Sequence, residues 1–85
     1  MYHVYMLLTS GGTLYTGQTN NLTRRMKEHG AKANKTAKYL RRFASFKLVY
    51  CEKLKTRAEA MKREGEIKKW PRRKKDGLIM NDLDL

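Results

Sequence analysis

The stretch from Tyr2 to Leu8 constrains the fold more than any other part of the chain, because it is almost continuously apolar and aromatic. Runs of this kind are typical of strands that are covered on both faces. Residues 10–13 (Ser-Gly-Gly-Thr) follow, and glycine supplies the positive φ angles that tight turns require. We therefore predict a strand at the centre of its sheet, a hairpin turn, and a returning strand over residues 14–16 or slightly beyond.

The length of this turn decides the direction in which two tyrosines point. A two-residue turn would pair Tyr15 with Leu8, on the opposite face of the sheet from Tyr5. An odd-length connection or a bulge would place both tyrosines on one face. We predict the second arrangement, because only then can the two hydroxyl groups belong to one site.

A short helix is expected after the returning strand. Residues 18–21 form a polar segment that we expect to be a loop, and one of its two asparagines can cap a helix that extends to about Gly30. Leu22 begins the apolar stripe of this helix, and Arg25 and His29 lie at the edge of the stripe. The Arg25 guanidinium is therefore the one that we expect to be held against the sheet.

The second half of the chain predicts one more strand and two helices. Residues 46–53 alternate in polarity, so we predict a third strand with its even-numbered residues on one mostly buried side. Residues 56–59 (Thr-Arg-Ala-Glu) match a capping box, which starts a helix. That helix ends near Trp70, because Pro71 disfavours helical geometry in the residue before it and can begin another short helix.

Glu64 is the most informative residue of the longer helix. Ala60, Met61 and Ile67 share its helical stripe, so the carboxylate is predicted to lie among apolar side chains. Burying a carboxylate without a partner costs several kcal/mol, so it must meet a cation, either a side chain or a metal ion. The structural alternative is an ion pair with Arg25 or an exposed position at the edge of the stripe.

Length and charge set the class of the protein. A chain of 85 residues is expected to form one domain, residues 1–85, with a small core. The formal net charge is +12, and all 20 lysines and arginines lie from Arg24 onward. Such a charge favours an anionic partner, with nucleic acid first and a membrane surface second. No run of about 18 apolar residues is present, so no membrane span is expected.

Cysteine and histidine usage limits other kinds of site. Cys51 has no second cysteine to pair with, and it is interpreted as a small buried hydrophobe. Two histidines and one cysteine do not show the ligand spacing of a zinc site. The N-terminal residues lack the features of a signal peptide, so we expect the protein to be cytoplasmic.

Two triplets carry a resemblance to a known family. Residues 3–5 (His-Val-Tyr) and 15–17 (Tyr-Thr-Gly) are followed by Arg25, His29 and, on the later helix, Glu64. This pattern resembles the GIY-YIG nuclease domain over the whole chain. His and Val stand in the first triplet where the family has Gly and Ile, and Thr replaces Ile in the second. The small stand-alone members are most similar, since their AKY segment and late Leu-Ile pair before an asparagine match residues 37–39, 78–79 and Asn81, whose role is left open.

The resemblance implies a fold and an activity. The fold would be α/β, a small three-stranded antiparallel sheet flanked by helices. The activity would be metal-dependent endonuclease cleavage of DNA, more probable than RNA, with Glu64 binding one Mg²⁺ or Mn²⁺ ion. The catalytic residues implied are Tyr5, Tyr15, Arg25, His29 and Glu64. The alternative is a non-catalytic nucleic-acid-binding module on the same scaffold, such as an accessory to repair or to RNA.

Each implied role has an ordinary structural counterpart. A helix arginine such as Arg25 is usually solvated, although it can grip a phosphate bidentately. Tyr5 and Tyr15 would by default fill a core, and which of them acts as a base is left open. His29 has a favourable contact with the helix dipole as its alternative.

The basic segments are usually solvated surface, but with this net charge we favour contacts with the phosphate backbone that read no sequence. Gly17 meets a backbone demand and also lets a phosphate approach closely. The candidate substrate-binding residues are Gly17, Lys38, Tyr39, Arg41, Arg42, Arg72 and Arg73.

Overall fold

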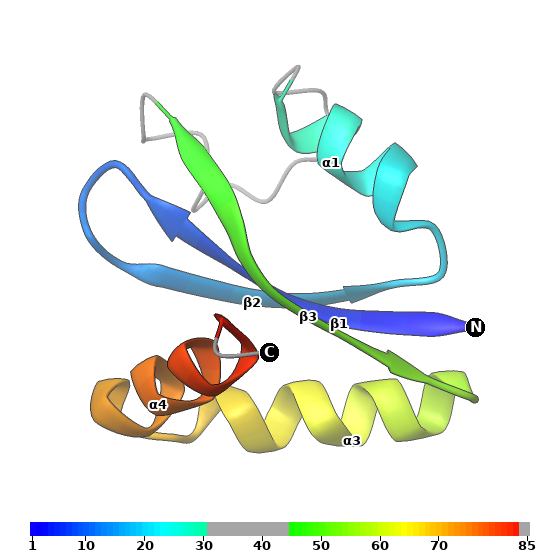
Figure 1. Cartoon of the computed structure of the whole chain (residues 1–85). Helices are drawn as coiled ribbons and strands as arrows, with labels where there is room; N and C mark the ends of the chain where they lie inside the picture. Colours follow the sequence, from blue (N-terminus) through cyan, green and yellow to red (C-terminus); the bar gives the residue numbers. More distant parts are fainter. Residues whose placement is uncertain (31–44, 84–85) are drawn as a thin grey trace.

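A computed structural model describes residues 1–30 and 45–83, apart from the side chains of residues 29, 30 and 81–83. The chain forms a three-stranded antiparallel sheet with helices on both faces, as predicted (Figure 1). The strand order is β2-β1-β3, so the apolar strand β1 is central. The elements are β1 (Tyr2–Thr9), β2 (Leu14–Thr19), α1 (Leu22–Gly30), β3 (Phe46–Leu54), α3 (Arg57–Lys68) and α4 (Arg72–Leu83).

The β1–β2 turn has an odd length, which confirms the prediction for the tyrosines. The Thr9 N–H donates to the Thr13 carbonyl at 2.9 Å, so three residues close the turn, and Gly12 has a φ of 84°. The resulting register pairs Leu7 with Tyr15, and Tyr5 lies two residues away on the same face. Strand β2 continues three residues beyond its predicted end, because residues 17–19 still pair with β1.

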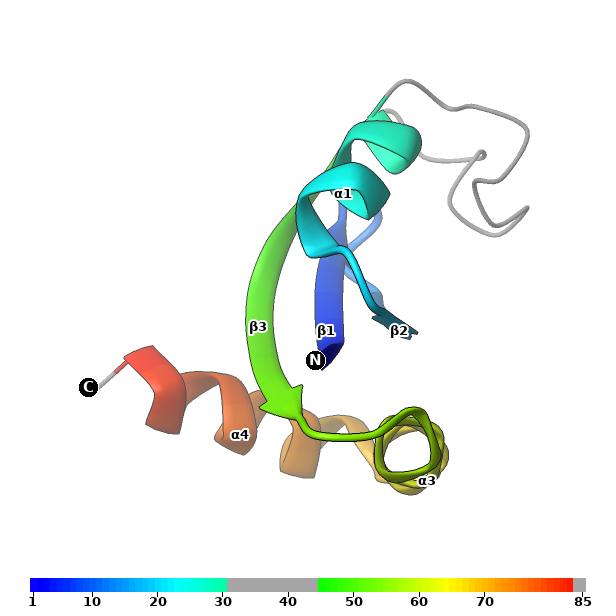
Figure 2. The ribbon, with the colours of Figure 1, turned by 90° about the vertical axis from the view of Figure 1, so that its right-hand side faces the viewer.

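Successive residues of β1 serve opposite faces of the sheet. Val4 and Met6 are fully buried in an apolar cluster that includes Ile67 of α3. Tyr5 and Leu7 are buried on the other face, where α1 packs. Viewed from the side, α1 lies on one side of the sheet and α3 with α4 on the other (Figure 2). In the described ranges, no helix has both the length and the apolar character needed to cross a bilayer.

Strand β3 does not have the single buried side that its alternation predicts. A bulge lies opposite Met6 and Leu7, where β3 contributes one extra residue. The extra residue reverses the alternation, so Phe46 packs in the cluster of Tyr5 while Tyr50 packs in the opposite cluster. Leu48 is 43% exposed. The prediction that the even-numbered residues share one buried side was therefore wrong.

Helix α3 begins as predicted, but one member of its apolar stripe is exposed. The Thr56 hydroxyl accepts from the Glu59 N–H at 3.1 Å and donates to the Glu59 carboxylate at 3.2 Å. Ala60 and Ile67 are completely buried, whereas Met61 is 55% exposed. Met61 lies about 100° around the helix from Ala60, outside the narrow strip that contacts the sheet, so its assignment to the core was wrong.

Candidate active site

Tyr5 and Gly17 lie next to each other in the candidate site. They are paired across β1 and β2, and Tyr5 is only 1% exposed. A Cβ atom built on Gly17 would lie 2.6 Å from the Tyr5 hydroxyl oxygen and 3.2 Å from Cε1 of Tyr15. The Tyr5 phenol therefore crosses the backbone of Gly17, where only glycine leaves room. The two tyrosines of the protein itself lie closest to Gly17 on this side, and the close approach of a phosphate to Gly17 stays a prediction.

The two tyrosine rings lie side by side on the α1 face. Their centroids are 6.5 Å apart and their planes are inclined at 43°. This tilted arrangement is typical of favourable aromatic pairs. The predicted convergence of the two phenols is thus present, and one of them is deeply buried.

Arg25 reaches this pair from α1. The helix is capped by Asn21, whose Oδ1 accepts from the Arg24 N–H at 3.0 Å. The Arg25 side chain is 24% exposed and lies 3.4 Å from the Glu28 carboxylate. Burial tends to lower the pKa of Arg25, but a hydrogen bond with Tyr5 and the contact with Glu28 raise it overall. The guanidinium is therefore held as a cation against the Tyr5 oxygen, which accepts from it.

The pKa of Tyr5 is raised above its ordinary value. Burial is the largest cause, and the hydrogen bond with Arg25 opposes it. The neighbouring Tyr15 and the negative charge of Glu64 add to the rise. Tyr5 is therefore a neutral phenol at physiological pH, and Glu64 lies within electrostatic reach of it although α3 packs against the other face of the sheet.

Glu64 is partly buried on α3 and has an ion-pair partner that the sequence analysis did not name. Its side chain is 21% exposed, and its Oε1 lies 2.9 Å from Nζ of Lys68. The Lys68 side chain is 53% exposed. The cation at the carboxylate is thus Lys68 rather than Arg25. The spacing of four residues between them is a signal that would have predicted this pair.

The residues around Glu64 limit the metal that the site can hold. Among the described residues, no group of three or more His, Cys, Asp and Glu side chains is arranged to bind a metal. One hard carboxylate fits Mg²⁺ or Mn²⁺, since such ions keep several waters and take further oxygens from substrate phosphates. Glu64 therefore fits the implied ion as one of its ligands.

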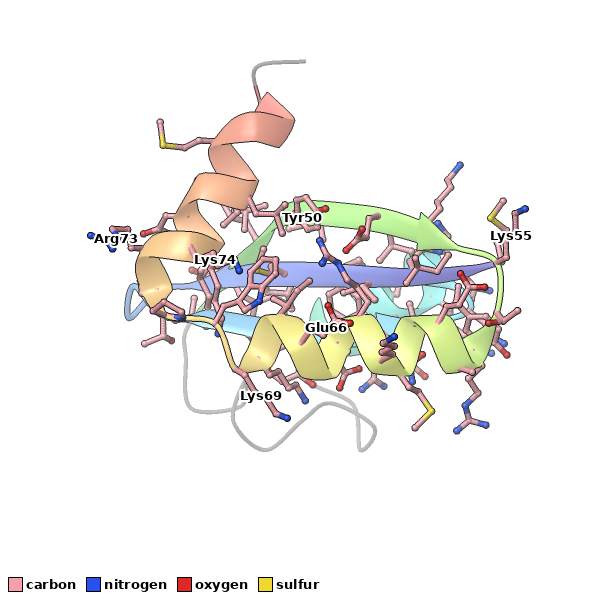
Figure 3. The ribbon with its side chains drawn as sticks, turned by 90° about the horizontal axis from the view of Figure 1, so that it is seen from below. Tyr50, Lys55, Glu66, Lys69, Arg73 and Lys74 are labelled. Carbon is pink, nitrogen blue, oxygen red and sulfur yellow. The ribbon has the colours of Figure 1, made fainter. Side chains whose placement is uncertain are left out.

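Arg72 and Arg73 are not brought to the tyrosine pair. Arg72 binds the β1–β2 turn, where its Nη1 donates to the Gly12 carbonyl at 2.6 Å and its Nε donates to Asp76 at 2.9 Å. Arg73 points away from α4 (Figure 3). The side chain of His29 and the residues Lys38, Tyr39, Arg41 and Arg42 lie outside the part of the chain that the structure describes.

A known family and several known proteins match most of the chain. The model of the GIY-YIG catalytic domain matches residues 1–76, a span that includes both tyrosines, Arg25 and Glu64. A UPF0213 protein of Natronomonas pharaonis is 41% identical over 81 residues, which are 95% of this chain and 93% of that protein. A UPF0213 protein of Halobacterium salinarum is 41% identical over 79 residues, which are 93% of this chain and 100% of that protein.

A solved structure is similar as well. The solution NMR structure of a UPF0213 protein from Bacillus halodurans has a TM-score of 0.60 and 40% sequence identity to this chain. The match covers 94% of this chain and 84% of the other. The chain therefore belongs to the GIY-YIG domain family and is a homologue of the UPF0213 proteins.

Proposed function

We propose that the protein is a metal-dependent endonuclease that hydrolyses phosphodiester bonds, in DNA rather than in RNA. One observation carries the proposal. The buried phenol of Tyr5 is hydrogen-bonded to the Arg25 guanidinium and lies within electrostatic reach of the Glu64 carboxylate, and the three residues come from three different elements. A cation, a neutral hydroxyl and an acid that converge in this way suit the binding and cleavage of a phosphate.

Arg25 would bind a non-bridging oxygen of the phosphate and stabilise the charge that develops on it. Its contact with Glu28 at 3.4 Å is longer than the 2.7–2.9 Å of a strong charge-assisted hydrogen bond. A phosphate can therefore compete for the guanidinium. The raised pKa of Arg25 supports its persistence as a cation through the reaction.

The two tyrosines would then have different roles. The raised pKa of Tyr5 makes it a poor base at neutral pH, so we assign it to donating a hydrogen bond that orients the phosphate or the attacking water. We assign the contact with the attacking water to Tyr15, which lies beside it, with His29 supporting. Tyr15 is the more exposed of the two rings, which favours access to that water.

Glu64 would hold the Mg²⁺ or Mn²⁺ ion, which supplies Lewis-acid stabilisation of the negative charge on the phosphate. Lys68 occupies that carboxylate in the free protein, but its exposed ammonium can turn into solvent at little cost. The basic side chains of the chain, among them Arg72 and Arg73, would contact neighbouring phosphates, consistent with a role in DNA repair within the cytoplasm.

Cleavage assays test this proposal. We expect cutting of at least one of a nicked, branched, single-stranded or duplex DNA in the presence of Mg²⁺ or Mn²⁺, and none in EDTA. A matched RNA strand should be cut more slowly. Absence of cutting on every substrate with either ion would contradict the nuclease activity.

A second candidate function is a nucleic-acid-binding module without turnover. The ion pair between Glu64 and Lys68 favours it, since that pair satisfies the carboxylate without a metal. This candidate predicts binding that weakens with salt and does not respond to divalent ions, together with intact substrate after prolonged incubation.

A further inference from the structure

A polar pocket of about 220 Å³ lies on the side of the sheet that faces α3, the helix that carries Glu64. It is formed where the start of β1, the end of β2 and the first turn of α3 meet, and these three segments gather at one end of the molecule (Figure 1). Its volume is below the roughly 300 Å³ at which drug-sized ligand pockets begin. The pocket therefore suits a small group such as a phosphate with part of its sugar. The lining residues are Tyr2, Gln18, Thr19, Asn20 and Arg57.

The chemistry of the lining favours an anion. Arg57 supplies a guanidinium, and Gln18 and Asn20 supply amide N–H donors, while no lining residue is acidic. Arg57 is exposed and has no ion-pair partner within residues 1–30 and 45–83. The cation is thus available to a ligand.

The position of Arg57 is also unfavourable for the helix that carries it. Arg57 is the first residue of α3, where the positive end of the helix dipole disfavours a cation and an acidic residue would be stabilising. A residue that reduces helix stability in an exposed position suggests a role other than folding. Binding an anion in the pocket would be such a role.

Arg57 of the pocket and Glu64 of the candidate active site lie on the same helix. Arg57 precedes Glu64 by two helical turns, so it lies on the same side of α3 and about 10 Å along the axis. On the facing strand β2, Gln18 directly follows Gly17. Gln18 is paired with Val4, so it lies on the face of the sheet that α3 covers, whereas Gly17 is paired with Tyr5 on the α1 face. The pocket is therefore linked to the candidate active site through Glu64, along α3.

We propose that this pocket is a second phosphate subsite, which binds the backbone of the nucleic-acid strand two to three nucleotides from the bond at the active site. At about 3.4 Å of axis per phosphate on one strand, a separation of about 10 Å corresponds to this number of nucleotides. The subsite fixes the register of the strand without reading its sequence. The path of the strand from Glu64 to the pocket rests on the function proposed above.

Binding in EDTA tests the subsite without requiring cleavage. We would titrate the ¹⁵N-labelled protein with a thymidine dinucleotide and with a thymidine tetranucleotide that carries a 5′-phosphate, whose four phosphates span about 10 Å, and follow the resonances of both sites. The tetranucleotide is expected to bind more tightly than the dinucleotide and to shift the side-chain amides of Gln18 and Asn20. In Arg57→Gln, the tetranucleotide should lose about fivefold to tenfold in affinity while the dinucleotide changes little.

Lys62→Gln is the matched control, because it removes the same charge from an exposed position on the same helix outside the pocket. Its tetranucleotide affinity should stay within about twofold of the natural protein, and the melting temperature of Arg57→Gln should be unchanged or slightly raised. Equal effects of the two substitutions, or an absence of binding in the natural protein, would overturn the subsite. A natural protein that binds as described but never cuts would leave the subsite standing and contradict only the nuclease proposal.

Discussion

The two faces of the sheet differ in what their buried residues do. On the face toward α3 and α4, Val4, Met6 and Ile67 are completely buried in an apolar cluster. On the face toward α1, the equally buried Tyr5 holds a polar contact with Arg25. One face therefore stabilises the fold, and the other carries polar groups that we propose for the chemistry, although both are built from neighbouring residues of the same strand.

Two arginines show the same difference at the level of single side chains. Arg63 and Arg25 are similarly exposed, at 27% and 24%. Nε of Arg63 lies 2.6 Å from the Glu52 carboxylate, and its Cζ lies 5.0 Å from the centre of the Trp70 ring. Nζ of Lys74 lies 4.2 Å from the centre of the same ring. Figure 3 shows Lys74 reaching from α4 over the sheet at this place.

These partners decide the use of each cation. A short bond with Glu52 is the largest cause that raises the pKa of Arg63, so this guanidinium is committed to joining β3 and α3. Arg25 has a longer contact with its acid and a neutral phenol beside it. Partner geometry rather than exposure thus separates a structural arginine from one that can bind a substrate.

The largest expected effect lies on the stabilising face. Replacing Ile67 with alanine removes a completely buried side chain and should lower the free energy of unfolding by about 2–5 kcal/mol. Denaturant unfolding measures this change. The matched Met61→Ala, at a position that is 55% exposed, should change it by less than about 0.5 kcal/mol. Equal losses in the two variants would mean that α3 does not pack through Ile67.

Arg25→Gln should lower cleavage and leave the stability nearly unchanged. Removal of the cation at the phosphate is expected to lower kcat/KM by about 10²–10³-fold, the usual effect of losing one group that stabilises transition-state charge. The free energy of unfolding should change by less than about 1 kcal/mol, because the contact with Glu28 is partly exposed and long and the glutamine amide can still donate a hydrogen bond to the Tyr5 hydroxyl. Unchanged cleavage by this variant would remove Arg25 from the site.

Arg63→Gln should show the reverse pattern with a smaller magnitude. Loss of the bond with Glu52 and of the stacking on Trp70 is expected to cost about 1–2 kcal/mol of unfolding free energy. Cleavage by the folded fraction should stay within about twofold. A fall in kcat/KM as large as that of Arg25→Gln would show that the two faces are not functionally separate.

The smallest expected effect concerns Tyr5 in alkaline solution. Its raised pKa means that the unfolded chain loses this proton first, near the ordinary value of about 10, while the folded protein keeps it. This contribution to stability is complete below that pH and is lost as the pH rises through the higher folded pKa. Tyr5→Phe should therefore lose less stability above pH 10 than the natural protein does. An ultraviolet titration in which all tyrosines ionise together near pH 10 would contradict the shift.

Much of the fold and part of the site could be predicted from the sequence. The apolar run of β1 and the glycine turn predict the central strand and the shared face of Tyr5 and Tyr15, because the period of a strand is fixed once the turn length is known. The bulge in β3 could not be predicted, since its alternation continues through the extra residue. The pairing of Glu64 with Lys68 follows from a helical spacing, but the approach of Glu64 to Tyr5 depends on where α3 lies against the sheet.

The most direct test of the central claim is to measure cleavage and binding together for the natural protein and Glu64→Gln, with Mg²⁺ or Mn²⁺ present. We predict that the variant keeps its fold and its salt-sensitive binding of DNA but loses cleavage by about 10³-fold or more. Cleavage at the natural rate by the folded variant would contradict the role of Glu64, and with it the proposed site made by Tyr5, Arg25 and Glu64.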